Sequence, residues 1–292
     1  MNKVQRVSSL RAAVDAARKD RKTIGFVPTM GNLHDGHLEL VRQAMRSADF
    51  VIVSIYVNPT QFGANEDLSN YPSTPDADAR MLAELGTDLL FLPEQTTMYP
   101  GDLDEQTVVY VPKIGDLYCG KDRPEHFYGV TTVVSRLFNM VQPDVAIFGK
   151  KDYQQLAIIR RMVDDLAYPI QVVGVDTVRS EDGLALSSRN GYLTTKELEA
   201  APKLQQSLQA MAQVLQAQSA VVSKKALKEL QDKAKQDLSK FGFKPQYVTV
   251  CRQADLKPAK KGDTTLVILA AAQLGNARLI DNLEVELGGV SE

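Results

Sequence analysis

The first half of the chain alternates short β-branched runs with amphipathic helical patterns, and this alternation limits the possible folds more than any other feature. The runs typical of buried strands cover residues 23–27, 51–57, 89–92, 145–148 and 170–175. Parallel strands need a crossover between them, usually a helix, so strands that alternate with helices predict a parallel sheet covered by helices. We therefore expect an α/β protein with a Rossmann-like parallel sheet.

The helices between these runs carry apolar residues at helical spacing. From Gly129 onward the pattern is Val130, Val133, Val134, Leu137, Phe138 and Val141, and a second helix is expected from Asp152 towards Leu166. After about residue 176 the pattern changes to long helices, opened by the capping-box pair Thr194 and Glu197. Strands return at residues 247–251, 266–271 and 278–283. We expect a first domain over residues 1–176 and a smaller α+β domain over residues 177–292.

Composition excludes several classes of protein. The 292 residues carry a net charge of -2 at pH 7, whereas a nucleic-acid binder needs clustered Lys and Arg over a broad face. The two cysteines are too few for a disulfide framework, and the first residues lack the apolar run of a secretory signal. The longest apolar stretches are far shorter than the ~20 residues of a membrane-spanning helix. We expect a soluble cytoplasmic enzyme that binds neither nucleic acid nor membrane.

One segment has the form of a phosphate-binding turn. An apolar strand ending near Phe26 and Val27 leads into a turn that contains Gly31 and Gly36, and a helix follows. Backbone N–H groups at a helix start have no partner within the helix, and the helix dipole favours an anion there. The turn lacks the Lys-Ser/Thr of the ATPase loop and the G-x-G-x-x-G of the dinucleotide fold. The local sequence thus predicts an anion site and does not identify the ligand.

Two of the three histidines, His34 and His37, lie in this turn. Because they are three residues apart, both imidazoles lie on one face of a helical first turn, where they could donate to phosphate oxygens. Two other interpretations stay open. The histidines could simply cap or pack, or they could bind zinc, although H-x-x-H without a nearby third ligand is a weak zinc motif.

Two further segments offer donors to an anion. Gly149, Lys150 and Lys151 follow the strand at residues 145–148 and precede a helix that starts at Asp152. The stretch 186–190 places two hydroxyls and a guanidinium after an apolar triplet. Each has an ordinary alternative: the first as a solvated lysine pair beside an N-cap, and the second as a turn.

Together these motifs resemble the pantothenate synthetase family, which belongs to the HIGH-motif nucleotidyltransferases related to class I aminoacyl-tRNA synthetases. The resemblance covers about the first two thirds of the chain. It rests on the motifs at residues 26–31, 57–63, 123–127, 149–155 and 186–190. It implies a nucleotidyltransferase domain followed by a lid domain. It also implies an ATP-dependent ligase that activates pantoate as an adenylate and transfers it to β-alanine, with Mg²⁺ and commonly as a homodimer.

The resemblance also implies roles for individual residues. His37, His34, Lys151 and Arg189 correspond to catalytic positions, with His37 as the family's catalytic histidine. Gln61 and Gln155 correspond to the pantoate-binding glutamines, Gln61 also near β-alanine, and no protein-bound metal is implied. The ATP-binding positions are Met30, Gly31, Asn32, Leu33, His34, Asp35, Gly36, His37, Gly149, Lys150, Lys151, Asp152, Val178, Leu186, Ser187, Ser188 and Arg189.

The sequence departs from the family at two places. Leu186 replaces a common Met at similar volume, so adenine packing should survive, and Lys150 replaces a common Glu, which adds positive charge near the phosphates. His126 fits the family motif, but structural and functional roles are both open to it. Three alternatives remain: a nucleotidyltransferase that stops at the adenylylated product, a zinc hydrolase that uses the three histidines, and a nucleotide sensor without activity.

Overall fold

The computed structural model describes residues 1–63, 66–217 and 223–288, and these divide into two compact units. The first unit contains residues 1–116, 123–150 and 155–176. The second contains residues 177–292 together with two short segments from earlier in the chain, 117–122 and 151–154. The turn that carries the lysine pair is therefore divided, since Lys150 belongs to the first unit and Lys151 to the second.

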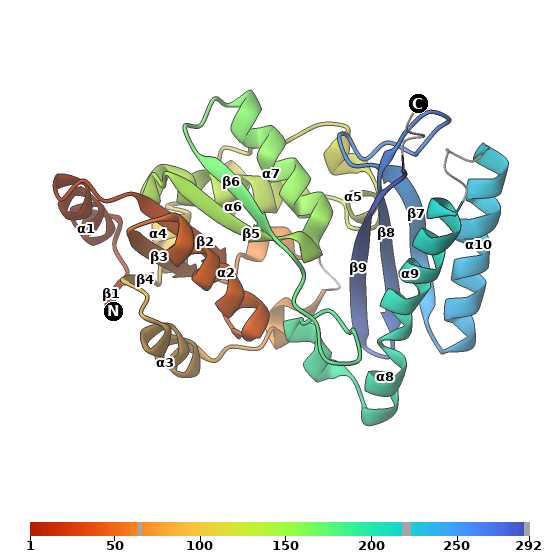
Figure 1. Cartoon of the computed structure of the whole chain (residues 1–292). Coiled ribbons are helices and arrows are strands. Elements are labelled where there is room, and N and C mark those ends of the chain that lie inside the picture. Colours follow the sequence, from red (N-terminus) through yellow and green to blue (C-terminus); the bar gives the residue numbers. More distant parts are fainter. Residues whose placement is uncertain (64–65, 218–222, 289–292) are drawn as a thin grey trace. The chain divides into compact units, whose positions relative to one another are not determined.

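The first unit is built on a six-stranded sheet in the order β1-β4-β3-β2-β5-β6 (Figure 1). Every pairing in this sheet is parallel. Its strands are β1 (Asn2–Val4), β2 (Ile24–Thr29), β3 (Phe50–Ile55), β4 (Leu89–Phe91), β5 (Val145–Gly149) and β6 (Gln171–Val175). The chain runs from β2 through β3 to β4 in one direction across the sheet and then returns to β5 on the other side of β2. The switch point of the topology therefore lies between β2 and β5.

Helices of the first unit pack on both faces of this sheet. They are α1 (Val7–Lys19), α2 (Asp35–Ser47), α3 (Pro75–Leu85), α4 (Gln95–Met98), α6 (His126–Val141) and α7 (Tyr153–Asp165, whose first two residues belong to the second unit). Val27 and Val53 share a cluster with Val41 of α2 and Leu82 of α3. The neighbouring Phe26 meets Phe138 of α6, with ring centroids 6.5 Å apart. Because alternate residues of β2 are buried against different helices, this central strand is apolar on both faces.

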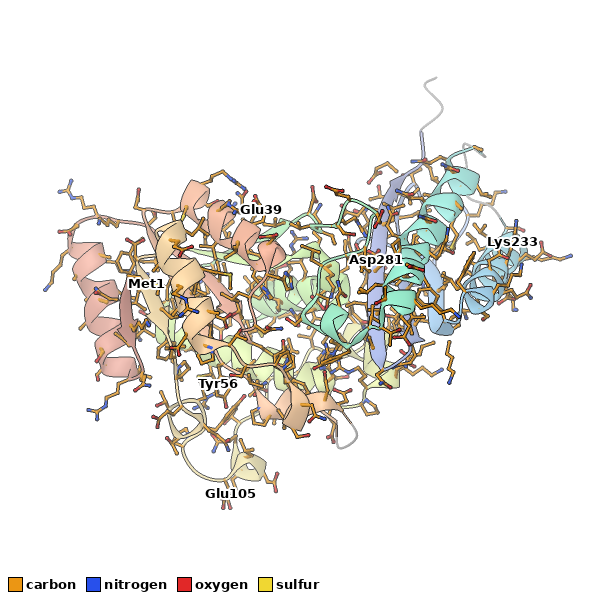
Figure 2. All side chains as sticks on the ribbon, turned by 90° about the horizontal axis from the view of Figure 1, so that it is seen from below. Met1, Glu39, Tyr56, Glu105, Lys233 and Asp281 are labelled. Atoms are coloured by element: carbon orange, nitrogen blue, oxygen red, sulfur yellow. The ribbon has the colours of Figure 1, made fainter. Side chains whose placement is uncertain are left out.

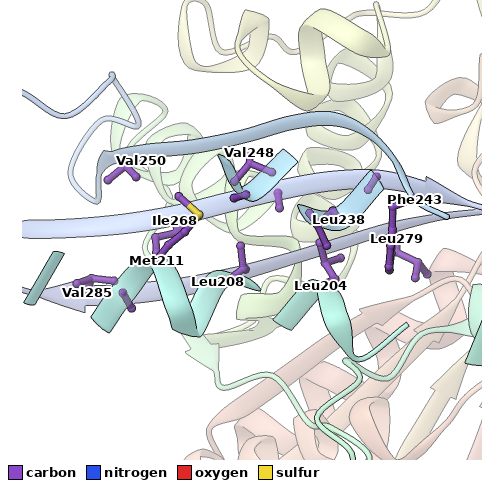
Figure 3. Packing of buried hydrophobic residues seen from close by; sticks show 14 of the residues in the cluster. Leu204, Leu208, Met211, Leu238, Phe243, Val248, Val250, Ile268, Leu279 and Val285 are labelled. Carbon is purple, nitrogen blue, oxygen red and sulfur yellow. The ribbon is translucent and has the colours of Figure 1, made fainter. Parts of the chain in front are cut away.

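The second unit is a three-stranded antiparallel sheet packed against helices. The strands β7 (Lys244–Arg252), β8 (Thr265–Leu274) and β9 (Ala277–Glu286) lie in that order, so β9 is an edge strand. Leu208 and Met211 of α9, Leu238 of α10 and Ile268 of β8 belong to one hydrophobic cluster between the helices and the sheet (Figure 3). The helices are α5 (Cys119–Asp122), α8 (Thr195–Ala200), α9 (Lys203–Gln216) and α10 (Lys224–Lys240).

Six 3-10 turns complete the described elements: η1 (Pro59–Gln61), η2 (Asp67–Asn70), η3 (Leu103–Glu105), η4 (Ile114–Asp116), η5 (Lys150–Asp152) and η6 (Ser188–Tyr192).

The expected fold class is confirmed, with a parallel α/β sheet followed by a small antiparallel sheet. One detail differs from the sequence expectation. The three-residue strand β1 was not expected, because residues 2–4 carry no apolar pattern of their own. The helices expected from Thr194 onward are present as α8 and α9; α8 ends at Ala200, and Pro202, which lacks an N–H to donate, precedes α9. The predicted capping box of Thr194 and Glu197 is present.

Candidate functional site

The turn after β2 is held by a buried carboxylate. Gly31 and Asn32 both have left-handed backbone, with φ of 83° and 49°. The backbone N–H groups of Asn32 and Leu33 each donate to Asp78 at 2.9 Å, and the Thr74 hydroxyl donates to the same carboxylate at 2.9 Å. A Cβ on Gly31 would lie 3.0 Å from Ile55, so the turn is tightly enclosed. Sequence reasoning missed Asp78, which looks like an ordinary acidic residue in the first turn of a helix.

His34 and His37 form a capping box at the start of α2. His34 is the N-cap, and its Nδ1 accepts from the backbone N–H of Gly36 at 3.1 Å. The Nδ1 of His37 accepts from the backbone N–H of His34 at 3.3 Å. The two rings lie with centroids 4.1 Å apart. The structure thus bears out the capping interpretation and brings both imidazoles together, with His34 one residue before the helix rather than inside its first turn.

Capping also fixes the protonation pattern of both rings. An Nδ1 that accepts from a backbone N–H carries no proton, so each neutral imidazole bears its proton on Nε2. Each histidine can therefore act as a hydrogen-bond donor through Nε2. In each ring, Nδ1 caps the helix and Nε2 carries the N–H that can donate to a ligand.

The turn after β5 lies beside the same helix. A Cβ on Gly149 would lie 3.9 Å from Leu40 of α2, so this turn and α2 are in contact range. The end of β5 and the helix that follows the turn after β2 thus lie side by side near the switch point, where open α/β sheets bind ligands. The Nζ of Lys150 is 2.8 Å from Asp176, which offsets the positive charge that Lys150 adds.

Gln61 lies in the turn after β3, and Asn58 fixes its side chain. The Asn58 amide donates to Gln61 Oε1 and to the Gly129 carbonyl, each at 3.1 Å. Its Oδ1 accepts from the hydroxyls of Tyr99 at 2.9 Å and Thr60 at 3.0 Å. Burial raises the pKa of Tyr99, so this hydroxyl keeps its proton and remains a donor. Asn58 is 1% exposed with its hydrogen-bonding capacity used, which makes the Gln61 rotamer well defined.

The side-chain nitrogen of Gln61 reaches the turn after β2, since Nε2 lies 3.0 Å from the Met30 sulfur. The structure therefore brings the turns after β2 and β3 together in the first unit, where α2 also lies against the end of β5.

The backbone of Gln61 is held by a charged network. The Nδ1–H of His126 donates to the Gln61 carbonyl at 2.8 Å, and Nε2 of His126 accepts from Arg123 at 3.1 Å. Arg123 also binds both carboxylate oxygens of Glu66 at 2.5 Å. Burial would raise the pKa of Glu66, but the hydrogen bonds and charge of Arg123 outweigh it and hold that pKa below its usual value. His126 therefore has a structural role, because it holds the Gln61 backbone; the sequence had left structural and functional roles open.

The neighbouring glutamines of α7 have different surroundings. Gln154 is 5% exposed, donates to the Leu117 carbonyl at 2.7 Å and accepts from the Cys119 N–H at 3.1 Å, all within the second unit. Gln155 belongs to the first unit and is half-buried. Gln154 is therefore committed to packing, and Gln155 is the more accessible of the two.

In the second unit, Val178 and Leu186 lie at the base of a short hairpin. The Leu186 N–H donates to the Val178 carbonyl at 3.0 Å, and Arg179 and Ala185 form an isolated bridge. Ser187 then caps the turn η6, since its hydroxyl accepts from the Arg189 N–H at 3.3 Å. The turn interpretation of this stretch is thus correct for its backbone.

Lys151 and Ser187 line one pocket of the second unit, together with Arg278 and Asp281. The Lys151 side chain is 20% exposed, and its Nζ lies 4.0 Å from Asp152, whose carboxylate is about half exposed. Two of the donors expected on the triphosphate therefore share one pocket.

The zinc alternative finds no ligand set in the described part of the chain. Across residues 1–63, 66–217 and 223–288, no group of three or more His, Cys, Asp or Glu side chains is placed to hold a metal ion. His126 does not join His34 and His37, because it binds Arg123 and Gln61. Among the same residues, no helix has the length and hydropathy to cross a membrane.

Several known proteins that are similar to this chain belong to one enzyme family. The profile of the Pantoate-beta-alanine ligase family matches residues 2–284. A pantothenate synthetase of Pseudomonas putida is 54% identical over 287 residues, 98% of each chain. The crystal structure of pantothenate synthetase from Thermus thermophilus matches with a TM-score of 0.89 at 45% identity, covering 98% of this chain and 100% of that one. A pantoate-beta-alanine ligase from Francisella tularensis, complexed with beta-gamma ATP and beta-alanine, matches with a TM-score of 0.79 at 33% identity, covering 97% of each chain.

Proposed function

Because this chain belongs to the pantoate–β-alanine ligase family, we propose that it joins pantoate to β-alanine with ATP, giving pantothenate, AMP and pyrophosphate. The observation that carries the proposal is the family match over residues 2–284 on a sheet whose switch point gathers the histidine turn, the turn after β5 and Gln61. The similar ligase from Francisella tularensis is a complex with beta-gamma ATP and beta-alanine, which supports both substrates.

The reaction divides into two displacements. A carboxylate oxygen of pantoate attacks the α-phosphorus of ATP, the bond from that phosphorus to the bridging oxygen breaks, and pyrophosphate leaves. The amine of β-alanine then attacks the acyl carbon of pantoyl adenylate, and AMP leaves with the acyl C–O bond electrons as the amine loses a proton. Neither step requires a protein nucleophile. The residues of this chain need only bind, orient and stabilise charge.

The first step builds negative charge on the bridging and non-bridging oxygens, and His37 and His34 are suited to meet it. Their Nδ1 atoms accept from the backbone, so their Nε2–H groups are the donors. Lys151 and Arg189 add positive charge, and the backbone of residues 30–36 supplies amides at a helix start. We assign the remaining ATP contacts to Gly149, Lys150, Asp152, Val178 and residues 186–188.

Gln61 and Gln155 are proposed to hold pantoate. An amide binds a carboxylate or hydroxyl without neutralising it, so the attacking oxygen keeps its nucleophilicity better than it would against a bidentate Arg. Gln61 is fixed at both ends, through Asn58 and through its own carbonyl, which suits a residue that orients a small substrate. Phosphate-bearing acceptors would call for Arg or Lys at these places, which disfavours a nucleotidyltransferase that stops at an adenylylated product.

Mg²⁺ is proposed as the companion of ATP. Mg²⁺ binds phosphate oxygens with one or two carboxylates and several waters. The half-exposed carboxylate of Asp152, beside Lys151, is an oxygen donor of the right kind. When bound, the ion neutralises charge on the leaving pyrophosphate. Residues 177–292 are proposed to act as a lid domain, and the protein to work as a cytoplasmic homodimer.

The test is pyrophosphate release across a panel of hydroxy acids, with and without β-alanine. Pantoate alone should release up to one equivalent per active site, and β-alanine should allow AMP to turn over. Equal turnover with unrelated acids would refute the proposal.

A second measurement separates the cap from the chemistry. His37→Gln keeps an acceptor at the third helical position and should preserve unfolding stability, yet it should slow pyrophosphate release about 100-fold, as loss of a preorganised donor does. Unchanged pyrophosphate release in this variant would refute the role assigned to His37, whereas a wild-type protein that binds ATP and releases no pyrophosphate with any acid would be the nucleotide sensor.

A further inference from the structure

Asp281 and Asn282 of the edge strand β9 each hold one of the proposed ATP-binding segments of the second unit. Consecutive residues of a strand point to opposite faces, and these two do so on β9, where Figure 2 labels Asp281. Asp281 shares the helix-packed face with Leu279 and Val285, which belong to the hydrophobic cluster. Asn282 faces the other way. Each side chain reaches a segment that lies more than 100 residues earlier in the chain.

On the helix-packed face, Asp281 binds the hairpin that precedes Ser187. Arg179 donates to the two oxygens of Asp281 at 2.7 and 2.8 Å, in a bidentate pair whose carboxylate side chain is 2% exposed. Arg179 also donates to the Gly183 carbonyl at 3.1 Å, which closes the hairpin. The planar guanidinium thus fixes both the distance and the orientation between β9 and the hairpin. Residues 186–189 leave directly from its base.

On the opposite face, Asn282 binds the segment that carries Lys151. Its amide donates to the Lys151 carbonyl at 3.0 Å. Its own backbone N–H donates to Asp281 Oδ1 at 2.8 Å, so the two residues also fix each other. Lys151, Ser187 and Asp281 line the same pocket. The register of β9 therefore sets where the ammonium of Lys151 and the hydroxyl of Ser187 stand relative to one another.

A carboxylate on the hydrophobic face of β9 is not explained by stability alone. Replacing a buried ion pair by apolar residues of similar volume is often neutral or stabilising, whereas such a pair can fix one geometry among several. Preorganised donors lower the cost of binding a charged ligand because they need no reordering when it arrives.

We propose that Asp281 and Asn282 are positioning residues for ATP, which set the Lys151 segment and the Ser187–Arg189 segment in one geometry through Arg179 and the Lys151 carbonyl. The proposal rests on the proposed function, since it takes these two segments as ATP-binding. Neither residue needs to touch the nucleotide. Their effect should therefore fall on ATP and spare β-alanine.

The experiment measures KM for ATP and for β-alanine, together with the affinity of the intact protein for a non-hydrolysable ATP analogue by calorimetry. The variants are Asp281→Asn, which weakens the bidentate pair, and Asn282→Ala, which removes the donor to Lys151. Each has a matched control in the same unit. Asp255→Asn alters an Arg–Asp pair with Arg252, and Gln253→Ala removes an amide that donates to the Leu266 carbonyl at 2.9 Å.

Asp281→Asn and Asn282→Ala should each raise KM for ATP and weaken the analogue about tenfold, below the roughly 100-fold that a 1 Å misplacement can cost. KM for β-alanine should stay within about twofold of wild type, and both controls should leave all three constants within that range. Failure of the wild type to use pantoate would count against the proposed function, while the analogue affinities would still test the positioning.

A double variant separates positioning from stability if Asp281→Asn unfolds. Combining Arg179→Met with Asp281→Leu replaces the ion pair by apolar groups and should keep the melting temperature, yet this protein should still lose ATP affinity. Wild-type affinity in a stable double variant, or equal changes for ATP and β-alanine in the single variants, would overturn the proposal.

Discussion

Gly129 of α6 is where a single methyl group should damage both the fold and the proposed pantoate site. A Cβ at this position would lie 2.3 Å from the Thr60 carbonyl oxygen and 2.6 Å from the Gln61 nitrogen, whereas ordinary contact begins at 3.4 Å. Gly129→Ala must therefore move the turn Pro59–Gln61 by about 1 Å, because both atoms it meets are backbone. Overpacking of this kind costs about 1–3 kcal/mol, and the better helix propensity of Ala recovers at most about 1 kcal/mol.

The larger effect should be on activity. A displacement of about 1 Å can cost roughly 100-fold in rate, and Gln61 is the residue displaced. We expect kcat/KM for pantoate to fall by about 10- to 100-fold, while ATP-analogue affinity changes little. The assay is pyrophosphate release against pantoate concentration, with urea unfolding of the same preparation. Gly288→Ala is the matched control, since nothing lies within 4 Å of its Cβ. Wild-type kcat/KM and unfolding free energy in Gly129→Ala would refute the reasoning.

Three further predictions concern buried or partly buried groups in the two units. The folded-state pKa of Glu66 lies below its usual value near 4.5. The stability that its carboxylate contributes is therefore present above the unfolded pKa and is lost as pH falls through the folded pKa. Urea unfolding between pH 5 and 3 should show a smaller loss of unfolding free energy for Glu66→Gln than for wild type. Asp78→Ala leaves two backbone N–H groups without an acceptor and should lower the unfolding free energy by roughly 2–3 kcal/mol, whereas an unchanged urea midpoint would contradict its role. Burial raises the pKa of Cys251 to about 12, so iodoacetamide at pH 8.5 should leave it unmodified in native protein and label it in urea, as mass spectrometry can locate.

The parallel sheet could be predicted from sequence because its central strands are buried on both faces. Residues such as Phe26 and Val27 are apolar in succession, and that run is visible without any tertiary information. Strand β1 could not be predicted in this way. Its three residues become a strand only by pairing with β4, more than 80 residues away along the chain. Long-range pairing leaves no periodic trace in so short a segment.

The candidate site could be predicted from residue types with distinctive chemistry, but the residues that hold them in place could not. The two histidines and the lysine pair stand out because they follow buried strands. Asp78 is 45 residues from the Leu33 amide that it holds, and Asp281 is 102 residues from Arg179. Each looks like an ordinary acidic residue until the fold brings its partner to it. Residues that position a site in this way can therefore be identified only from the contacts of the folded structure.

His34 and His37 show that a structural and a chemical role need not compete. Their sequence offered capping and phosphate binding as alternatives, and the structure shows both Nδ1 atoms accepting from the backbone at the start of α2. An imidazole has a second nitrogen, and using one as an acceptor determines that the other carries the proton. Asn or Asp would cap the helix as well, but would not present an N–H on the far side of a rigid ring. The capping box is thus a reason for histidine here, because it supplies the tautomer that a triphosphate would require.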